Sequence, residues 1–361
     1  MATVAALYLL GLTTAAALVA CGTGDVQLGE NLPAAQADAA AFGADGGDAR
    51  TATSSCAGSR SSVPLPAVGD CTGDLAKRTF RFAVCACTNI NFAGNLVTDA
   101  RSSATGTASA TAASVGVDGT YSGASSATSI GGSLWTNGDT SMSGHDVSGD
   151  LQCGGNLVAD GTSRVHTDAY VQGGVQGALT VDGVLHIPAG QPHVGVSAAG
   201  GTTVQPVAVA APCDCSNPLD VRAIVAGFKQ ANDDAAIGLD PASLASVDTD
   251  RTVTLPCGRY YLTSIGGGAP LTVRVTGRAA IAVEASVIHN LTAVTFSVDP
   301  GAELDLFVGG DVLFSGPAQI GNKARAAATR LYVGGVFGYD GQLQLAANLY
   351  LPNGAFTTTH W

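Results

Sequence analysis

The cysteines are the residues of this chain most able to do chemistry, and Cys21 differs in kind from the other eight. It follows an almost uncharged run from Met1 to Ala20 and has the small residue Ala20 directly before it. A bacterial lipoprotein signal ends in this way, since the thiol receives a diacylglyceryl group and cleavage leaves the modified cysteine as the new N-terminus. We therefore predict a signal peptide at 1–20, lipidation of Cys21, and a protein held at the membrane by its lipid.

The signal lacks one usual feature, because no Lys or Arg precedes Arg50. An uncleaved membrane anchor and a cleaved, unanchored product are therefore the alternatives. Gly22 stands where lipoproteins kept in an inner membrane commonly carry Asp. We expect an outer-membrane, surface-exposed location.

The remaining eight cysteines are even in number, as in a disulfide framework of an exported protein. Two pairs have C-x-C spacing, which puts both thiols on one face of a strand. A bond within such a pair would be strained, so each cysteine should reach a distant partner. Zinc held by the two C-x-C pairs is the alternative, although C-x2-C spacing is usual for zinc. The disulfide candidates are Cys56, Cys71, Cys85, Cys87, Cys153, Cys213, Cys215 and Cys257.

Two groups of acidic residues have spacings worth weighing for catalysis or metal binding. Glu303 and Asp305 would share one face of a strand, as an acid pair for sugar chemistry would, or they simply face solvent. Aspartates at 233, 234, 240, 248 and 250 match no calcium-loop pattern. Nucleophile-elbow, Walker and dinucleotide motifs are absent from the sequence. We predict no catalytic residue, no metal and no cofactor.

The composition bounds the class of protein. The 361 residues include 48 Gly, only 12% are charged, and the net charge is −12. Few charges with abundant Gly suit a β-rich extracytoplasmic protein rather than a helical bundle. Nucleic-acid binding is excluded as an expectation, because it requires clustered Lys and Arg.

A short unit, apolar-x-Gly-x-Leu/Val, recurs through the middle of the chain, in places at six-residue steps such as Val147 to Cys153 and Val175 to Val181. Short strands with glycine corners at a short period predict an all-β fold, a parallel β-solenoid. A β-sandwich is the alternative. The expected order is signal 1–20, disordered acidic tether 21–55, solenoid 56–211, helix-and-loop insertion 212–250 and solenoid 251–361.

Within that order, Leu219–Lys229 has helical spacing, and strands are expected at 252–255, 259–262, 271–275, 280–284, 293–298 and 303–308. The same Val-x-Gly pattern on both sides of the insertion indicates one continuous solenoid or two stacked ones. More solenoid is expected after Leu349–Asn353, so a C-terminal cap would be missing.

Several phrases carry a resemblance to known sequences: Cys85-Ala-Cys87, Pro212-Cys-Asp-Cys215, Leu255-Pro-Cys-Gly-Arg-Tyr-Tyr-Leu262 and Glu303-Leu-Asp-Leu-Phe-Val308. Together they resemble an uncharacterised group of predicted lipoproteins from myxobacteria and relatives. The C-terminal third is similar to a domain of unknown function found in adhesin-like β-helix proteins. The resemblance implies a surface lipoprotein with a β-solenoid body and brings no catalytic residues.

These observations favour a non-enzymatic envelope lipoprotein with a structural or adhesive role, binding surface polysaccharide or an envelope protein. A carbohydrate-active β-helix enzyme, using Glu303 and Asp305, is the first alternative, and a periplasmic scaffold is the second. Exposed strand edges at a solenoid end would invite self-association, including assembly into fibres.

Overall fold

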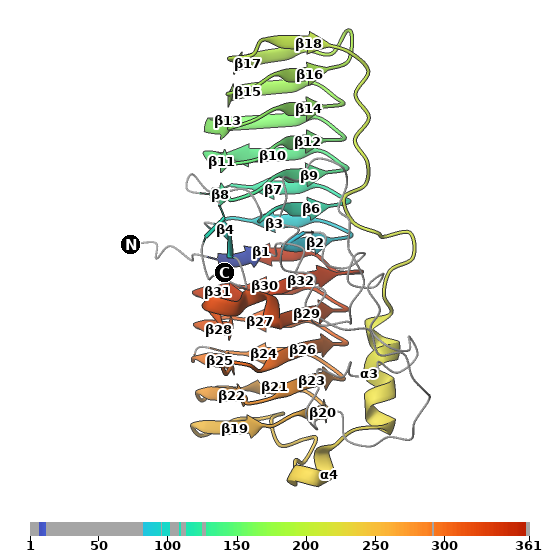
Figure 1. The fold of residues 1–361 in the computed structure, drawn as a ribbon, viewed down its shortest axis with the longest axis vertical. Helices are drawn as coiled ribbons and strands as arrows, with labels where there is room; N and C mark the ends of the chain where they lie inside the picture. The colour runs from blue at the N-terminus through green and yellow to red at the C-terminus, as the bar shows by residue number, and fades with distance from the viewer. Residues whose placement is uncertain are drawn as a thin grey trace, which may run out of the picture.

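A computed structural model describes residues 7–11, 82–94, 96–101, 108–109, 113–124, 128–290 and 292–358 of the chain. Within these ranges the fold is a parallel β-solenoid with few and short helices, which confirms the predicted fold class (Figure 1). Strand β1 (Leu7–Gly11) pairs in parallel with β4 (Leu96–Arg101). The tether expected at 21–55 lies outside the described residues.

The N-terminal half, residues 82–204, has triangular turns that settle to 16–18 residues from Leu134 onward. Partners on one face step from Leu134 to Leu151, Ala169 and Leu185. The six-residue motif therefore marks one side of a triangle, and three sides make a turn. Its strands are β2 (Val84–Ala86), β3 (Ile90–Phe92), β4 (Leu96–Arg101), β5 (Ala108–Ser109), β6 (Val115–Val117), β7 (Tyr121–Gly123), β8 (Thr128–Ile130), β9 (Leu134–Thr136), β10 (Thr140–Ser143), β11 (His145–Val147), β12 (Leu151–Cys153), β13 (Leu157–Val165), β14 (Ala169–Val171), β15 (Val175–Val181), β16 (Leu185–Ile187), β17 (His193–Ala198) and β18 (Thr202–Val204).

These short strands form because their residues alternate between the core and the surface. In β12, Leu151 and Cys153 are fully buried while Gln152 between them is half-exposed. Each buried Leu or Val contributes roughly 1.5–3 kcal/mol. At the bend in β15, Gly177 adopts φ +103°, and a Cβ there would lie 2.0 Å from the carbonyl oxygen of Ala159. Only glycine fits such a corner.

Most turns of the C-terminal half, residues 251–358, are wider. Partners step 23 residues from Leu271 to Val294 and 25 from Ala318 to Leu343. The strands expected at 271–275 and 303–308 are present with those bounds. The strands and one 3-10 helix are β19 (Arg251–Leu255), β20 (Gly258–Leu262), β21 (Ile265–Gly267), β22 (Leu271–Val275), β23 (Arg278–Val283), β24 (Val287–His289), β25 (Val294–Val298), β26 (Glu303–Val308), β27 (Val312–Phe314), β28 (Ala318–Gly321), η2 (Lys323–Ala328), β29 (Thr329–Val333), β30 (Phe337–Tyr339), β31 (Leu343–Ala346), β32 (Asn348–Leu351) and β33 (Phe356–Thr358).

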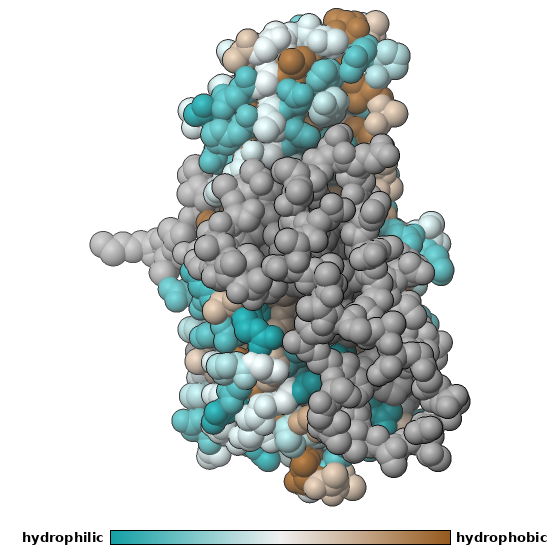
Figure 2. Space-filling view, in the orientation of Figure 1, coloured by the Kyte–Doolittle hydropathy of each residue, from teal (hydrophilic) through white to brown (hydrophobic). Residues whose placement is uncertain are grey.

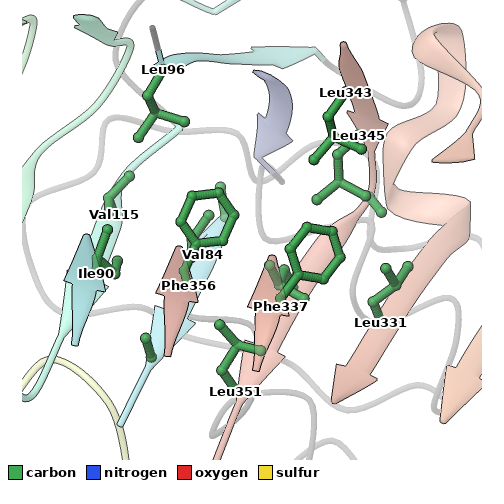
Figure 3. Close-up of a cluster of buried hydrophobic side chains, with 14 of the residues drawn as sticks. Val84, Ile90, Leu96, Val115, Leu331, Phe337, Leu343, Leu345, Leu351 and Phe356 are labelled. Carbon is green, nitrogen blue, oxygen red and sulfur yellow. The ribbon is translucent and has the colours of Figure 1, made fainter. Parts of the chain in front are cut away.

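The two halves stack in an order that the chain does not follow. The last turn of the C-terminal half lies against the first turn of the N-terminal half, through β32 with β2 and β33 with β3. One sheet of 12 strands therefore runs through both halves. At this seam Phe356 and Phe337 pack beside Val84 and Ile90 (Figure 3).

The seam corrects the expectation of a missing C-terminal cap. Phe356 of β33 pairs both with Phe337 of β30 and with Ile90 of β3. The N-terminal half therefore covers the last turn, and the two halves make one continuous stack.

A return segment, residues 205–250, carries the chain from one end of the solenoid back to the other (Figure 1). It contains α3 (Val221–Gln230), close to the predicted helix, and the short α4 (Asp234–Ile237). Asp220 caps α3 by accepting the Ala223 N–H at 2.9 Å. Ile224 and Phe228 of α3 are fully buried against the outer face of the C-terminal half.

Candidate functional site

Glu303 and Asp305 share the outer face of β26, as the period-2 pattern predicts. That face is buried rather than open to solvent, since the two residues are 9% and 7% exposed. Arg330 of β29 lies in register with Asp305 and is 2% exposed. Its guanidinium donates to the Asp305 carboxylate, with Nη2 3.0 Å from Oδ2, and to Glu303 Oε2 at 3.1 Å. The suspected acid pair is thus a buried ion cluster.

The electrostatics of this cluster are those of a salt bridge that joins β26 to β29. Desolvation works to lower the pKa of Arg330, but the Asp305 and Glu303 carboxylates outweigh it and hold that pKa above its ordinary value. A general acid or base must face its substrate with a transferable proton. Here both carboxylates face a permanently charged guanidinium under a covered surface, which is the chemistry of a salt bridge.

The same outer face carries an aromatic row that α3 covers. Phe307 stacks on Tyr332 with ring centroids 4.5 Å apart, and Phe228 of α3 lies 5.9 Å from Phe307. Tyr261 and Tyr350 continue the buried cluster. In the C-terminal half this face is therefore buried by packing against the rest of the chain.

In the N-terminal half the same row of positions continues with half-exposed side chains. We call Trp135, Gln152, Tyr170 and His186 the outer row, one residue per turn on β9, β12, β14 and β16. The rings of Tyr170 and His186 stack with centroids 4.4 Å apart and an interplanar angle of 6°.

Polar groups flank the stacked pair. Tyr170 Oη donates to Asp168 at 3.4 Å, and His186 Nε2 lies 3.7 Å from the same carboxylate. Gln205, the first residue of the return segment, lies with Nε2 3.0 Å from His186 Nδ1. Burial raises the pKa of the Tyr170 hydroxyl above its ordinary value, aided by Asp168. The phenol therefore stays neutral, and the row offers aromatic side chains beside hydrogen-bonding groups.

A second polar cluster lies on the neighbouring face, outside β11 and β13. His166 Nε2 is 2.7 Å from Asp146 Oδ1, and its Nδ1 is 3.1 Å from Asp182 Oδ2. Arg164 Nη2 is 2.9 Å from the same Asp182 carboxylate, whose pKa it holds below the usual range. These side chains are between 30% and 53% exposed, so their remaining hydrogen-bonding capacity faces water.

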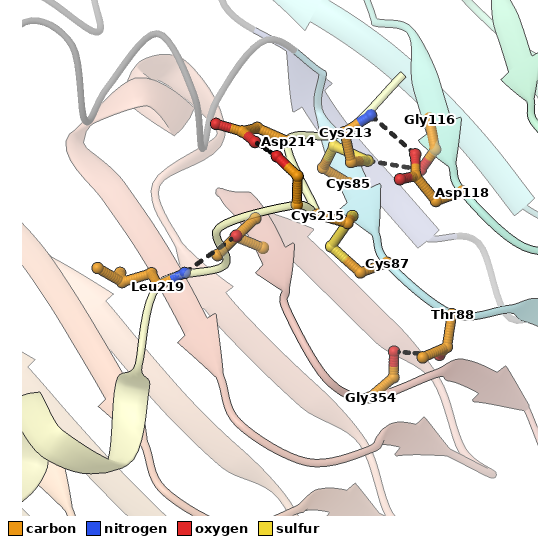
Figure 4. The surroundings of a disulfide bond; sticks show 12 residues. Cys85, Cys87, Thr88, Gly116, Asp118, Cys213, Asp214, Cys215, Leu219 and Gly354 are labelled. Atoms are coloured by element: carbon orange, nitrogen blue, oxygen red, sulfur yellow. Dashed lines mark hydrogen bonds between the residues drawn. A yellow bond between two sulfur atoms is a disulfide. The ribbon is translucent and has the colours of Figure 1, made fainter. Parts of the chain in front are cut away.

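The two C-x-C pairs bind each other across the fold. Cys85 is bonded to Cys213 and Cys87 to Cys215, each over 128 residues of sequence (Figure 4). The distant partners that the spacing predicts are therefore confirmed. Both bonds fasten the return segment to β2, beside the seam. The backbone N–H of Cys213 also donates to Asp118 at 3.0 Å.

Metal-binding chemistry has little support among the described residues. Asp118, Cys213 and Cys215 bring ligand atoms within 4.8 Å of one another, but both thiols are used in disulfides. Among the aspartates of the return segment, Asp233 accepts the Arg259 N–H at 2.8 Å and Asp234 accepts the Tyr261 N–H at 3.1 Å. Local hydrogen bonding accounts for both residues.

Cys153 is a correction to the disulfide expectation. It is a free cysteine with its thiol in the core, 3.4 Å from the carbonyl oxygen of Gly155. It fills an inward position of β12 that Thr136 and Val171 take on the adjacent turns, so it packs as a small apolar residue. Cys257 is disulfide-bonded. Cys21, Cys56 and Cys71 lie outside the described residues.

The comparisons with known proteins bear on the C-terminal part of the chain. Residues 216–360 contain a domain of unknown function (DUF7305). No curated protein and no solved structure matches the chain. In the part of the chain that the structure describes, no helix is long and apolar enough to cross a membrane.

Sequence reasoning missed the outer row, although a signal for it exists. Trp135, Gln152, Tyr170 and His186 are spaced 17, 18 and 16 residues apart, which is the length of one turn. The six-residue motif does not reveal this spacing, because its period corresponds to one side of the triangle and the outer row repeats once per whole turn.

Proposed function

We propose that this protein is a non-enzymatic lipoprotein of the cell envelope that serves a structural or adhesive role by binding polysaccharide on its N-terminal half. The outer row carries the proposal. Parallel strands repeat about every 4.8 Å, so Trp135, Tyr170 and His186 stand along a straight line on one flat face. Such a line of aromatic side chains suits an extended glycan chain, whose sugar rings carry apolar CH groups.

The polar groups beside the row fit the same ligand. Sugar hydroxyls both donate and accept hydrogen bonds, and Asp168, Gln152 and the neighbouring Asp146–His166–Asp182 cluster supply both kinds of partner. A neutral glycan suits this face better than an acidic one, because the chain carries a net charge of −12.

Binding of purified, oxidised protein to a panel of envelope polysaccharides tests the proposal. Tyr170→Ala removes one ring of the stacked pair and should weaken binding about tenfold, the equivalent of about 1.4 kcal/mol. Ile288→Ala is the matched control, since Ile288 is an exposed side chain (41%) on the C-terminal half. Equal binding by wild type and Tyr170→Ala, or binding to no glycan, would overturn the proposal.

The envelope location rests on the sequence around Cys21 and on the disulfides, which persist in oxidising compartments. Protease shaving of intact cells, with lysed cells as the control, tests it. Release of peptides from 150–350 by intact cells supports surface exposure. Release only after lysis would replace the adhesive role with that of a periplasmic scaffold.

The enzyme alternative depends on Glu303 and Asp305, and their pairing with Arg330 favours an ionic role instead. Polysaccharide incubated with the wild-type protein should keep its chain length. Degradation that Glu303→Gln abolishes would establish the alternative.

A further inference from the structure

The two ends of the solenoid are built differently, and the end at β19–β21 is covered over β20 and β21. The return segment passes under it, so that Leu244 and Val247 are buried beneath the core. The backbone of this segment also bonds to the edges of β20 and β21. The Asp233 N–H donates to the Arg259 carbonyl at 2.7 Å, and the Gly266 N–H donates to the Leu244 carbonyl at 2.9 Å. We call this the capped end.

The opposite end, formed by β17 and β18, is open (Figure 1). Strand β17 pairs with β15 alone and β18 with β16 alone. Val194 and Val204 are 65% and 60% exposed, the highest fractions among the large hydrophobic residues that the structure describes. Figure 2 shows apolar side chains at this extremity of the molecule.

The open end also directs backbone groups away from the molecule. Backbone N–H and C=O groups alternate between the two edges of a strand. Since the Pro192 carbonyl and the Ala199 N–H bond to β15, the N–H groups of His193 and Val196 are directed off the end. In β18, the Gln205 N–H bonds to Ile187, so the N–H of Val204 also points outward.

The strand edges at the open end have no charged side chains in the sequence around them. From 183 to 213 the sequence contains no Asp, Glu, Lys or Arg, within a chain that carries 44 such residues as 16 basic and 28 acidic. Natural proteins commonly block exposed strand edges with charged side chains, which this end lacks.

We propose that a second copy of this chain docks on the open end, open end against open end, to give a closed dimer about a twofold axis. The open end is uncharged and edge-exposed, so two copies can pair their outward N–H and C=O groups as antiparallel strands. A head-to-tail contact needs the capped end, where the edges of β20 and β21 are already bonded. The assembly therefore stops at two copies and does not continue into a fibre.

The size of the end sets the strength of the dimer. Strand β17 has 6 residues, and strands rise about 3.3 Å per residue with facing sheets about 10 Å apart, so the end face covers a few hundred Å² per copy. That lies at the low end for specific interfaces. We expect a dimer that forms at roughly micromolar concentration and dissociates on dilution.

Sedimentation velocity of the full oxidised chain, with its Cys21 lipid removed by Cys21→Ser, tests the proposal over a dilution series. Wild type should pass from monomer to dimer, and Val204→Lys should stay monomeric, because it places a charge in an otherwise uncharged interface. Val194→Lys is the second variant, at a position too exposed to affect folding. Val158→Lys is the control, since Val158 is exposed (38%) on β13 away from both ends.

A dimer in wild type and Val158→Lys that both end variants abolish supports the proposal. A wild-type monomer at about 100 µM, a concentration well above that at which such an interface should assemble, overturns it. A dimer that survives both end variants, or growth into fibres, also overturns it. Circular dichroism confirms that each variant is folded.

Discussion

The two halves belong to one solenoid but differ in how far their outer face is covered and in the residues that fill their core. In the C-terminal half the outer face is covered by α3, with Phe228 against Phe307 and Arg330 buried between two carboxylates. In the N-terminal half the corresponding positions, Tyr170 and His186 among them, stay half-exposed. The comparison shows that the outer face is covered in the C-terminal half and partly accessible in the N-terminal half.

The interiors differ in the same direction. Phe314, Phe337 and Phe356 pack ring against ring inside the C-terminal half. Inside the N-terminal half, Tyr121 Oη hydrogen-bonds His145 Nε2 at 3.0 Å. Large apolar rings contribute more burial energy than small or polar residues. The C-terminal half should therefore be the more stable of the two.

The largest predicted effect comes from the bonds that tie the return segment to the seam. Cys85–Cys213 and Cys87–Cys215 close loops of equal length, 128 residues each. One bond alone already restricts the unfolded chain, so Cys85→Ser with Cys213→Ser should cost little. Removing all four thiols should lower the free energy of unfolding by about 5 kcal/mol.

Urea unfolding of wild type, the paired variant and the fourfold variant measures this non-additivity. Equal losses from the first and second bond would contradict it. Hydrogen exchange adds a regional test, since a released segment should expose α3 and the face it covers while the core of β12–β16 stays protected.

A slightly smaller effect should follow from Arg330→Ala. The substitution leaves Glu303 and Asp305 buried and uncompensated, and breaking a buried pair costs about 3–5 kcal/mol. Arg274→Ala is the matched control, because Arg274 pairs with Asp299 on the surface with its side chain 54% exposed, and such pairs contribute about 0–1 kcal/mol. Similar denaturation midpoints for the two variants would show that the ion cluster around Arg330 does not stabilise the C-terminal half.

The sequence predicts much of this fold, because alternation and helical spacing are local. Leu271–Val275, Glu303–Val308 and α3 appear where their patterns place them. The seam between β33 and β3 joins residues more than 260 positions apart, and local patterns carry no information about such stacking.

The site was harder to predict for a related reason. A period-2 pattern shows that Glu303 and Asp305 share a face, but not what covers that face. Phe307, two residues further on the same face, was the available sign of burial. Cys153 was misassigned because an even count of cysteines says nothing about which thiols meet.

Acid should weaken the N-terminal half. Burial lowers the pKa of His145 from 6.5 to about 4, so the unfolded chain binds a proton that the folded protein excludes. The stability that neutral His145 contributes is present above pH 6.5 and is lost as pH falls toward 4, a loss of about 3 kcal/mol. Hydrogen exchange of β7–β11 between pH 7 and 4.5 measures it, and His145→Asn should flatten the dependence. Unchanged protection in wild type would contradict the prediction.

The capped end should respond to pH in the opposite sense, with the smallest effect of the four. Burial raises the pKa of Asp234 from 3.8 to about 6, so the folded protein binds a proton that the unfolded chain has released. The corresponding stability is present below pH 3.8 and is lost as pH rises through 6. Because the cap is a single layer near solvent, we expect about 1 kcal/mol, or roughly fivefold in exchange protection of β20. Asp234→Asn keeps the acceptor for the Tyr261 N–H and should remove the slope. Opposite slopes in β20 and β7–β11 would show that the halves open independently, whereas a common slope would mean that the seam couples them into one cooperative unit.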